Sequence, residues 1–162
     1  LKTGHTDEAG FCLTASVVRA GRRIIVVLAG MNSMKARGSE GDKVIEWAYR
    51  VFNDYHLVKA GDAVDQAPVW MGETAQVPVT VRQDVTLTLP RASRADMQVK
   101  AVYDGPARAP VAQGQTVGSL VITAPDMQTV QVPLVASQPV ARLSPFGRMA
   151  AAAGYLIFGK RN

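Results

Sequence analysis

Ile24-Ile25-Val26-Val27-Leu28 is an uninterrupted apolar run, rich in β-branched residues and typical of a buried strand. The run lies within a strand-like segment from Arg23 to Met31. A second strand-like segment, Phe11 to Arg19, precedes it across the turn Ala20-Gly21, so the two predict a β-hairpin. Because the return segment is apolar on both faces, we expect it to be central in its sheet and covered on both sides.

An amphipathic helix is predicted directly after the hairpin, from about Glu40 to Tyr55. Its apolar residues recur at helical spacing: Val44, Ile45, Ala48, Val51, Phe52 and Tyr55. Ser39, followed three residues later by Asp42, provides a start signal. We expect this helix to cover one face of the hairpin.

Beyond the connection Lys59-Ala60-Gly61-Asp62, the pattern changes to short strand-like runs separated by turn clusters. The runs cover residues 77–81, 85–89, 97–103, 116–122 and 129–135. They predict a small all-β module, a sandwich. Trp47 and Trp70 are interpreted as packing residues, and His56 as a residue at the end of the preceding helix.

The last segment, residues 143–162, returns to a helical pattern. Ser144-Pro145 is a typical helix entry. One apolar side is bracketed by basic residues, which suits a helix lying on an anionic membrane surface; these basic residues are Arg148, Lys160 and Arg161. The competing interpretation is a core helix of the β module. We therefore expect three parts, residues 1–57, 58–140 and 141–162.

Composition indicates a globular protein, with 162 residues of which 48% are hydrophobic and 19% charged. No run approaches the roughly 20 apolar residues of a membrane-spanning helix. The net charge of +5 favours anionic partners, but the basic residues are scattered, so we expect no nucleic-acid partner. His5, His56 and Cys12 lack zinc-ligand spacing, so no metal site is expected.

Lys2-Thr3-Gly4 is the candidate active-site motif. The longer string, residues 1–10, reads LKTGHTDEAG and resembles the third signature of the low-molecular-mass penicillin-binding proteins, the serine-type D-alanyl-D-alanine carboxypeptidases. Residues 68–72 (PVWMG) and 87–91 (LTLPR) resemble two further segments of that family. The resemblance implies an α+β fold: the C-terminal part of a transpeptidase-like, serine β-lactamase-like domain, then a β domain and an amphipathic anchor helix.

The resemblance also assigns roles to the motif. Lys2 supplies a fixed positive charge, Thr3 a hydroxyl donor for the substrate carboxylate, and Gly4 room for the acyl group to approach the backbone. The backbone N–H of His5 belongs to the oxyanion hole, and His5 and Thr6 are expected to contact substrate.

Arg37 matches a family arginine that helps to bind the substrate carboxylate, a task suited to a planar bidentate donor. The next residue, Gly38, departs from the family pattern, where a larger polar residue is expected. The family's nucleophile lies in an S-x-x-K motif, with a second S-x-N motif for proton transfer. Neither occurs here in usable form, because residues 16–19 read SVVR and lie in a predicted strand.

The implied function is removal of the terminal D-alanine from peptidoglycan stem peptides that end in D-Ala-D-Ala, through an acyl-enzyme that β-lactams would trap and without a cofactor. The implied location is the periplasm, at the inner membrane. Because the sequence begins with Leu1 and lacks the serine motif, we expect it to start within a longer protein and to be inactive alone. The alternatives are a non-catalytic cell-envelope module and, more remotely, a serine β-lactamase.

Overall fold

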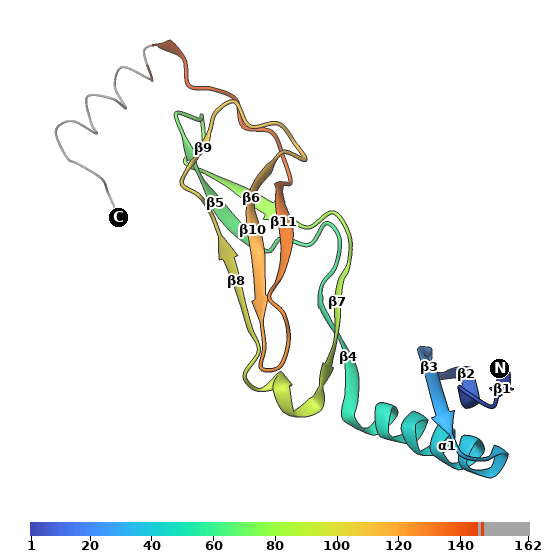
Figure 1. The fold of residues 1–162 in the computed structure, drawn as a ribbon. Coiled ribbons are helices and arrows are strands. Elements are labelled where there is room, and N and C mark those ends of the chain that lie inside the picture. Colours follow the sequence, from blue (N-terminus) through green and yellow to red (C-terminus); the bar gives the residue numbers. More distant parts are fainter. Residues whose placement is uncertain (146, 148–162) are drawn as a thin grey trace. The chain divides into compact units, whose positions relative to one another are not determined.

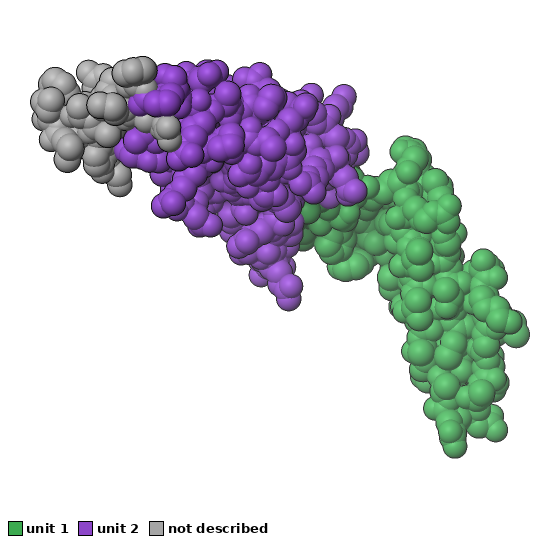
Figure 2. Space-filling view, turned by 90° about the horizontal axis from the view of Figure 1, so that it is seen from above, with its two compact units in different colours: residues 1–55, 87–94 green, residues 56–86, 95–162 purple. Residues whose placement is uncertain are grey.

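The computed structural model describes residues 1–145 and 147. Contacts divide the chain into two compact units (Figure 2). Unit 1 comprises residues 1–55 and 87–94, and unit 2 comprises residues 56–86 and 95–162. The division predicted after residue 57 and the one at 141 stay predictions.

Unit 1 is built on a three-stranded antiparallel sheet with the order β1-β2-β3 (Figure 1). Its strands are β1 (Lys2–Thr6), β2 (Gly10–Arg19) and β3 (Arg22–Met31). The predicted hairpin is confirmed, because β2 pairs with β3 up to the Arg19–Arg22 pair. Both turn residues have positive φ, 48° at Ala20 and 79° at Gly21, as in the two-residue turns whose twist matches that of paired strands.

Helix α1 (Met34–Val51) packs on one face of this sheet. Leu13, Ala15 and Val26 point from the sheet toward Ile45 of the helix and form the buried core of unit 1. This burial explains the period-two pattern of β2, in which Thr14 and Ser16 between them are exposed.

The predicted helix is confirmed, but both of its predicted ends are wrong. The helix begins earlier because Ser33 is the N-cap and its Oγ accepts a hydrogen bond from the Ala36 N–H at 3.0 Å. Ser39 lies inside the helix and donates to the Ala36 carbonyl at 3.2 Å. At the other end, Arg22 donates to the carbonyl of the C-cap residue Phe52 at 2.7 Å and to the Ala48 carbonyl at 3.1 Å, which also accepts from the Phe52 N–H.

The second face of the unit 1 sheet is exposed. Ile25 and Val27 of β3 are 66% and 71% exposed. The expectation that this strand is central and doubly covered is therefore wrong for the described residues, in which β3 is an edge strand covered by α1 alone.

Strands β4 (Phe52–Val58) and β7 (Val85–Pro90) form a two-stranded sheet, and a 3₁₀ turn, residues 91–94, follows β7. In unit 1, Thr88 donates to Asp54 at 2.7 Å. In unit 2, His56 Nδ1 lies 2.9 Å from Thr86 Oγ1. The interpretation of His56 as a helix-end residue is wrong, because it lies within β4.

Unit 2 contains a six-stranded sheet with the order β8-β10-β11-β6-β5-β9. The strands are β5 (Asp65–Trp70), β6 (Gln76–Thr80), β8 (Gln98–Val102), β9 (Ala107–Arg108), β10 (Thr116–Thr123) and β11 (Val130–Ala136). All neighbours run antiparallel except β5 and β9, which are parallel. Each predicted strand-like run contains a strand, namely β6, β7, β8, β10 and β11.

The core of unit 2 lies on one face of this sheet. Fully buried side chains come from the middle strands and include Val77, Val79, Leu120, Ile122 and Leu134. Residues 56–86 and 95–142 contain no helix, so this apolar face is buried by the sheet itself and its loops. Where the sequence predicts the two sheets of a sandwich, hydrogen bonds join these strands in one sheet.

The C-terminal helix stays a prediction, and two of the described residues within its predicted range are helical. Pro145 and Gly147 have helical conformation, and the Gly147 N–H donates to Ser144 Oγ at 3.2 Å. The rest of the helix predicted within residues 143–162 lies outside the described residues. Within residues 1–145 and 147, the structure has no helix with the length and apolar character needed to cross a membrane.

Candidate functional site

The motif residues lie on an edge strand. Every residue of β1 is exposed, and β1 pairs with β2 on one side only. The other side of its backbone faces no strand among the described residues. An edge strand with free backbone groups can accept an extended peptide as a further strand.

Consecutive motif side chains point to opposite faces of the sheet. Lys2 pairs with the exposed Thr14, whereas Thr3 pairs with the buried Leu13 and so lies on the face that α1 covers. A ligand lying along the free edge of β1 is thus within reach of Lys2 from one face and Thr3 from the other.

Gly4 is not required for packing within the described chain. A Cβ atom at this position would meet no atom within 4 Å. The space beside the Gly4 backbone is therefore open, as the close approach of a substrate requires.

The side chains of His5 and Arg37 both lie against the ring of Phe11. The His5 and Phe11 rings pair across β1 and β2, with centroids 4.0 Å apart. The Arg37 guanidinium lies 5.8 Å from the centre of the Phe11 ring, within cation–π range. Arg37 stands in the first turn of α1, where its N–H donates to the Ser33 carbonyl at 2.9 Å.

Hydrogen bonds of Thr6 and Ala9 stabilise the turn that follows β1. Thr6 Oγ1 accepts a hydrogen bond from the Ala9 N–H at 3.0 Å, and the Ala9 carbonyl accepts one from the Gly30 N–H at 3.0 Å. Gly10 has φ 64°, and a Cβ there would lie 2.9 Å from the Met31 carbonyl oxygen. Thr6 and Gly10 thus shape this turn, and the substrate-binding role of Thr6 stays a prediction.

An open hollow of about 380 Å³ lies beside the turn. It is lined by His5, Asp7, Glu8, Ala9, Gly10, Phe11, Gly30, Met31 and Asn32. Lys2 and Thr3 do not line it. Asp7 and Glu8 were not predicted as lining residues, although their position in the string LKTGHTDEAG was a signal for them.

Ser16, the serine of the incomplete motif, is engaged elsewhere. Its Oγ accepts a hydrogen bond from Arg23 Nη1 at 2.8 Å on the exposed face of the hairpin. The described residues contain no cluster of three or more His, Cys, Asp or Glu side chains able to hold a metal ion.

The perturbed ionisable groups lie outside the motif. A hydrogen bond from Arg19 lowers the pKa of Glu46, and both side chains are exposed. In unit 2, burial and a hydrogen bond to Asp65 raise the pKa of Tyr103; the Tyr103 hydroxyl donates to Asp65 Oδ2 at 2.9 Å.

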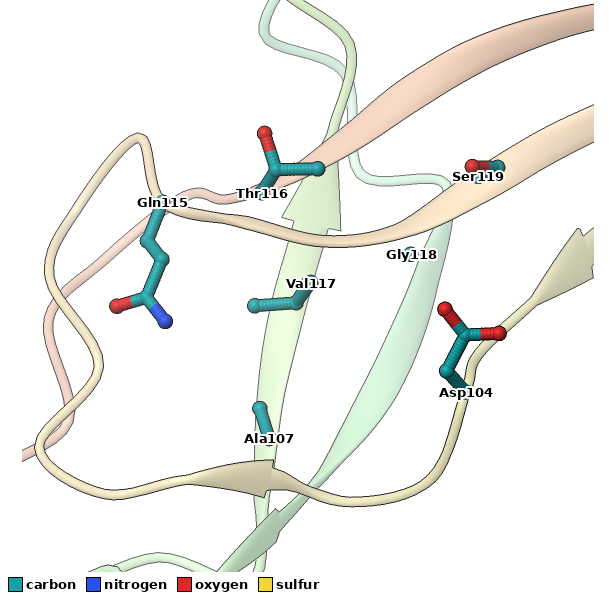
Figure 3. A pocket seen from close by; sticks show the side chains of 7 residues that line it. All are labelled: Asp104, Ala107, Gln115, Thr116, Val117, Gly118 and Ser119. Carbon is teal, nitrogen blue, oxygen red and sulfur yellow. The ribbon is translucent and has the colours of Figure 1, made fainter.

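Unit 2 has a polar hollow of about 290 Å³ (Figure 3). Its lining consists of Asp104, Ala107, Gln115, Thr116, Val117, Gly118 and Ser119. Asp104 is the sole ionisable residue in that lining, so the hollow lacks the pair of groups that acid–base chemistry needs. Gln115 is already engaged, since its Oε1 accepts from the Ala112 N–H at 3.0 Å.

Comparison with known proteins gives consistent matches. The model of the family "Penicillin-binding protein 5, C-terminal domain" matches residues 52–142. The chain is 32% identical over 150 residues to the D-alanyl-D-alanine carboxypeptidase DacA of Escherichia coli K12, covering 92% of this chain and 37% of that protein. It is 33% identical over 150 residues to DacD of the same strain, covering 92% of this chain and 39% of that protein.

Solved structures agree with this match. Penicillin-binding protein 5 of Haemophilus influenzae superposes with a TM-score of 0.72 at 26% identity, covering 88% of this chain and 42% of that one. The carboxypeptidase DacD of Francisella tularensis gives 0.68 at 32% identity, covering 88% and 36%. The chain thus spans well under half the length of the relatives that it matches.

Proposed function

Because the chain belongs to the family of the penicillin-binding protein 5 C-terminal domain, we propose that the complete protein is a serine-type D-alanyl-D-alanine carboxypeptidase. The observation that carries this proposal is the similarity to D-alanyl-D-alanine carboxypeptidases over 92% of the chain.

The proposed reaction removes the terminal D-alanine of a stem peptide. A serine outside residues 1–162 attacks the carbonyl carbon between the two D-alanines, and the peptide bond breaks as its nitrogen is protonated and leaves as D-alanine. Water then cleaves the ester and returns the proton to the serine oxygen. A β-lactam follows the first step, but the amine formed when its ring opens stays attached to the acyl group and cannot leave, so the ester persists.

The motif strand forms one wall of the site in this proposal. The free edge of β1 offers backbone groups to the extended end of the peptide, and the open space at Gly4 admits the acyl group. Lys2 provides positive charge from one face and Thr3 a hydroxyl donor from the other. The His5 N–H serves the oxyanion hole, where a fixed donor stabilises the charge that develops on the carbonyl oxygen.

Arg37 is proposed to bind the substrate's free carboxylate. Its position beside Phe11, which also contacts the His5 ring, supports a place close to β1. No acidic residue within salt-bridge distance of Arg37 is found in the described part of the chain, so its guanidinium is available to an anionic group.

The exposed face of the unit 1 sheet fits a larger catalytic domain of the transpeptidase type. Val18, Ile25 and Val27 share this face and are 52%, 66% and 71% exposed. Apolar side chains so arranged are normally covered. We propose that the rest of the catalytic domain covers them.

Residues 143–162 are proposed to hold the protein on the periplasmic surface of the inner membrane. The apolar side of this segment and its flanking basic residues support an interfacial position on anionic lipid. Unit 2 would then connect the catalytic domain to that surface.

The experiment is acylation of the complete protein by a fluorescent penicillin. Lys2→Ala should lower the acylation rate by at least about 100-fold, the order found when a donor to the developing charge is lost. Lys43→Ala is the matched control, because Lys43 forms an exposed pair with Glu40 on α1. This variant should be acylated at the wild-type rate. Residues 1–162 alone should not be labelled.

Equal labelling of wild type and Lys2→Ala would show that the motif is not part of the active site. A complete protein that is not labelled under any condition would instead favour a non-catalytic envelope module.

A further inference from the structure

The start of the segment 143–162 is fixed by backbone hydrogen bonds. The Leu143 N–H donates to the Met71 carbonyl at 2.9 Å, and the Glu73 N–H donates to the Ala141 carbonyl at 2.9 Å. Between these bonds, Gly72 and Arg142 form an isolated antiparallel bridge. The segment 143–162 therefore begins against the turn that ends β5.

That turn has little room to move. Met71 has φ 58°, and a Cβ on Gly72 would lie 2.7 Å from Val69 Cγ1 and 2.8 Å from Val140 Cγ1. Such close approach requires glycine and packs the turn on the core of unit 2. The residue just before the turn, Trp70, is thus held at a defined place beside the exit.

Trp70 lies on the outer side of the sheet. Val69 and Ala109 beside it are buried, whereas Trp70 is 39% exposed, so the earlier interpretation of Trp70 as a simple packing residue is incomplete. In the parallel pair of β5 and β9, Trp70 stands opposite Arg108, which places both side chains on the same side of the sheet.

We call Trp70, Arg108 and Arg142 the exit rim, because Trp70 pairs with Arg108 and Arg142 forms the bridge to Gly72, two residues after Trp70. Both arginines are exposed, and neither forms a salt bridge in the described part of the chain. Two acidic residues are close to the rim in sequence: Glu73 follows Trp70 by three residues, and Asp104 precedes Arg108 by four. Residues 56–86 and 95–142 carry five basic and seven acidic side chains, so the rim gathers two of the few cations of a net acidic region.

We propose that the exit rim is a second membrane contact, in which Trp70 enters the headgroup region of an anionic bilayer while Arg108 and Arg142 bind lipid phosphates. Tryptophan prefers the membrane–water interface, and basic side chains are attracted to anionic lipid. The acidic side chains elsewhere in unit 2 would be repelled by the anionic lipid, so the side of unit 2 that carries the exit rim would face the membrane. This proposal rests on the membrane role proposed for residues 143–162.

The first test uses tryptophan fluorescence of the 162-residue chain, whose two tryptophans are Trp47 and Trp70. In the variant Trp47→Phe, Trp70 is the one tryptophan left. Binding to vesicles of phosphatidylglycerol and phosphatidylcholine with brominated acyl chains should shift the emission of Trp70 to shorter wavelength and quench it. In the matched variant Trp70→Phe, the emission of Trp47 should stay unchanged.

The two proposals fail differently in this test. A chain that binds the vesicles without quenching of Trp70 overturns the exit rim and leaves the C-terminal anchor intact. A chain that does not float with the vesicles overturns the anchor and the rim together.

The second test measures the charge contribution. The double variant Arg108→Gln with Arg142→Gln should lower partitioning onto phosphatidylglycerol vesicles on the order of tenfold, and should have no effect on pure phosphatidylcholine. Lys59→Gln with Lys100→Gln removes two exposed lysines of unit 2 outside the rim and should change partitioning less than about twofold. Equal losses in the two double variants would mean that net charge, not the rim, is responsible.

Discussion

Substitution of two glycines of helix α1, one exposed and one buried, allows the effect of helix propensity to be measured separately from the effect of packing. Gly38 is exposed, and a Cβ there would meet nothing within 4 Å, whereas a Cβ on the buried Gly41 would lie 2.6 Å from Leu13 Cδ2. Alanine in place of glycine stabilises an exposed helix position by about 0.5–1 kcal/mol, so Gly38→Ala should raise the free energy of unfolding of unit 1 by that amount. At Gly41 the same gain is opposed by overpacking, which costs about 1–3 kcal/mol. We expect Gly41→Ala to lower the free energy of unfolding by roughly 0.5–2 kcal/mol.

The measurement is urea unfolding of the 162-residue chain followed by far-ultraviolet circular dichroism at the helical band. Gly38→Ala is the control for Gly41→Ala, since both make the same substitution within one turn of the same helix. If Gly41→Ala stabilises the protein as much as Gly38→Ala, the close approach of α1 to β2 at Leu13 is wrong.

Two further predictions concern single residues. In the complete protein, Arg37→Ala should cost on the order of 2–4 kcal/mol in kcat/KM for substrates ending in D-Ala-D-Ala and much less for an analogue with an amidated terminus, and an equal loss on both would make Arg37 structural. Because burial and the bond to Asp65 raise the pKa of Tyr103, folded unit 2 holds this proton more tightly than the unfolded chain, where tyrosine ionises near pH 10. The stabilisation is therefore complete below about pH 10 and is lost as the pH rises above it. In Tyr103→Phe, the urea midpoint of unfolding should decline less steeply above about pH 10 than in the wild type. An unchanged decline would contradict the assignment to Tyr103.

The strands of unit 2 were predictable where one face is buried. Val77 and Val79 on β6, and Leu120 and Ile122 on β10, give the alternation that period-two analysis detects. Strand β5 was missed because it begins with the polar residues Asp65 and Gln66, soon after the Gly- and Asp-containing connection, so no apolar run marks its start. Its backbone is nevertheless paired on both sides, with β6 and β9.

The ends of α1 depend on contacts that local sequence does not contain. Phe52 and Tyr55 continue the helical spacing, yet the helix ends at Val51, where Arg22 from the hairpin binds the Phe52 carbonyl. At the start, Ser33 and Ser39 are both plausible caps, and the choice depends on where the helix meets the sheet.

The candidate site shows the same limit. The motif at Lys2-Thr3-Gly4 was recognisable as a string, whereas the meeting of His5 and Arg37 at Phe11 requires the pairing of β1 with β2 and the position of α1. The exposed position of Trp70 had no signal in its own sequence, because it depends on the parallel pairing with β9.

The interleaving of the two units constrains how the chain is made. Because residues 87–94 belong with residues 1–55, unit 1 cannot be completed by the ribosome until Arg94 has emerged, by which time residues 56–86 of unit 2 are already present. Residues 56–86 must in turn wait for β10 and β11 before their sheet is filled. A cut after Tyr55 would therefore divide β4 and separate residues 87–94 from the unit to which they belong.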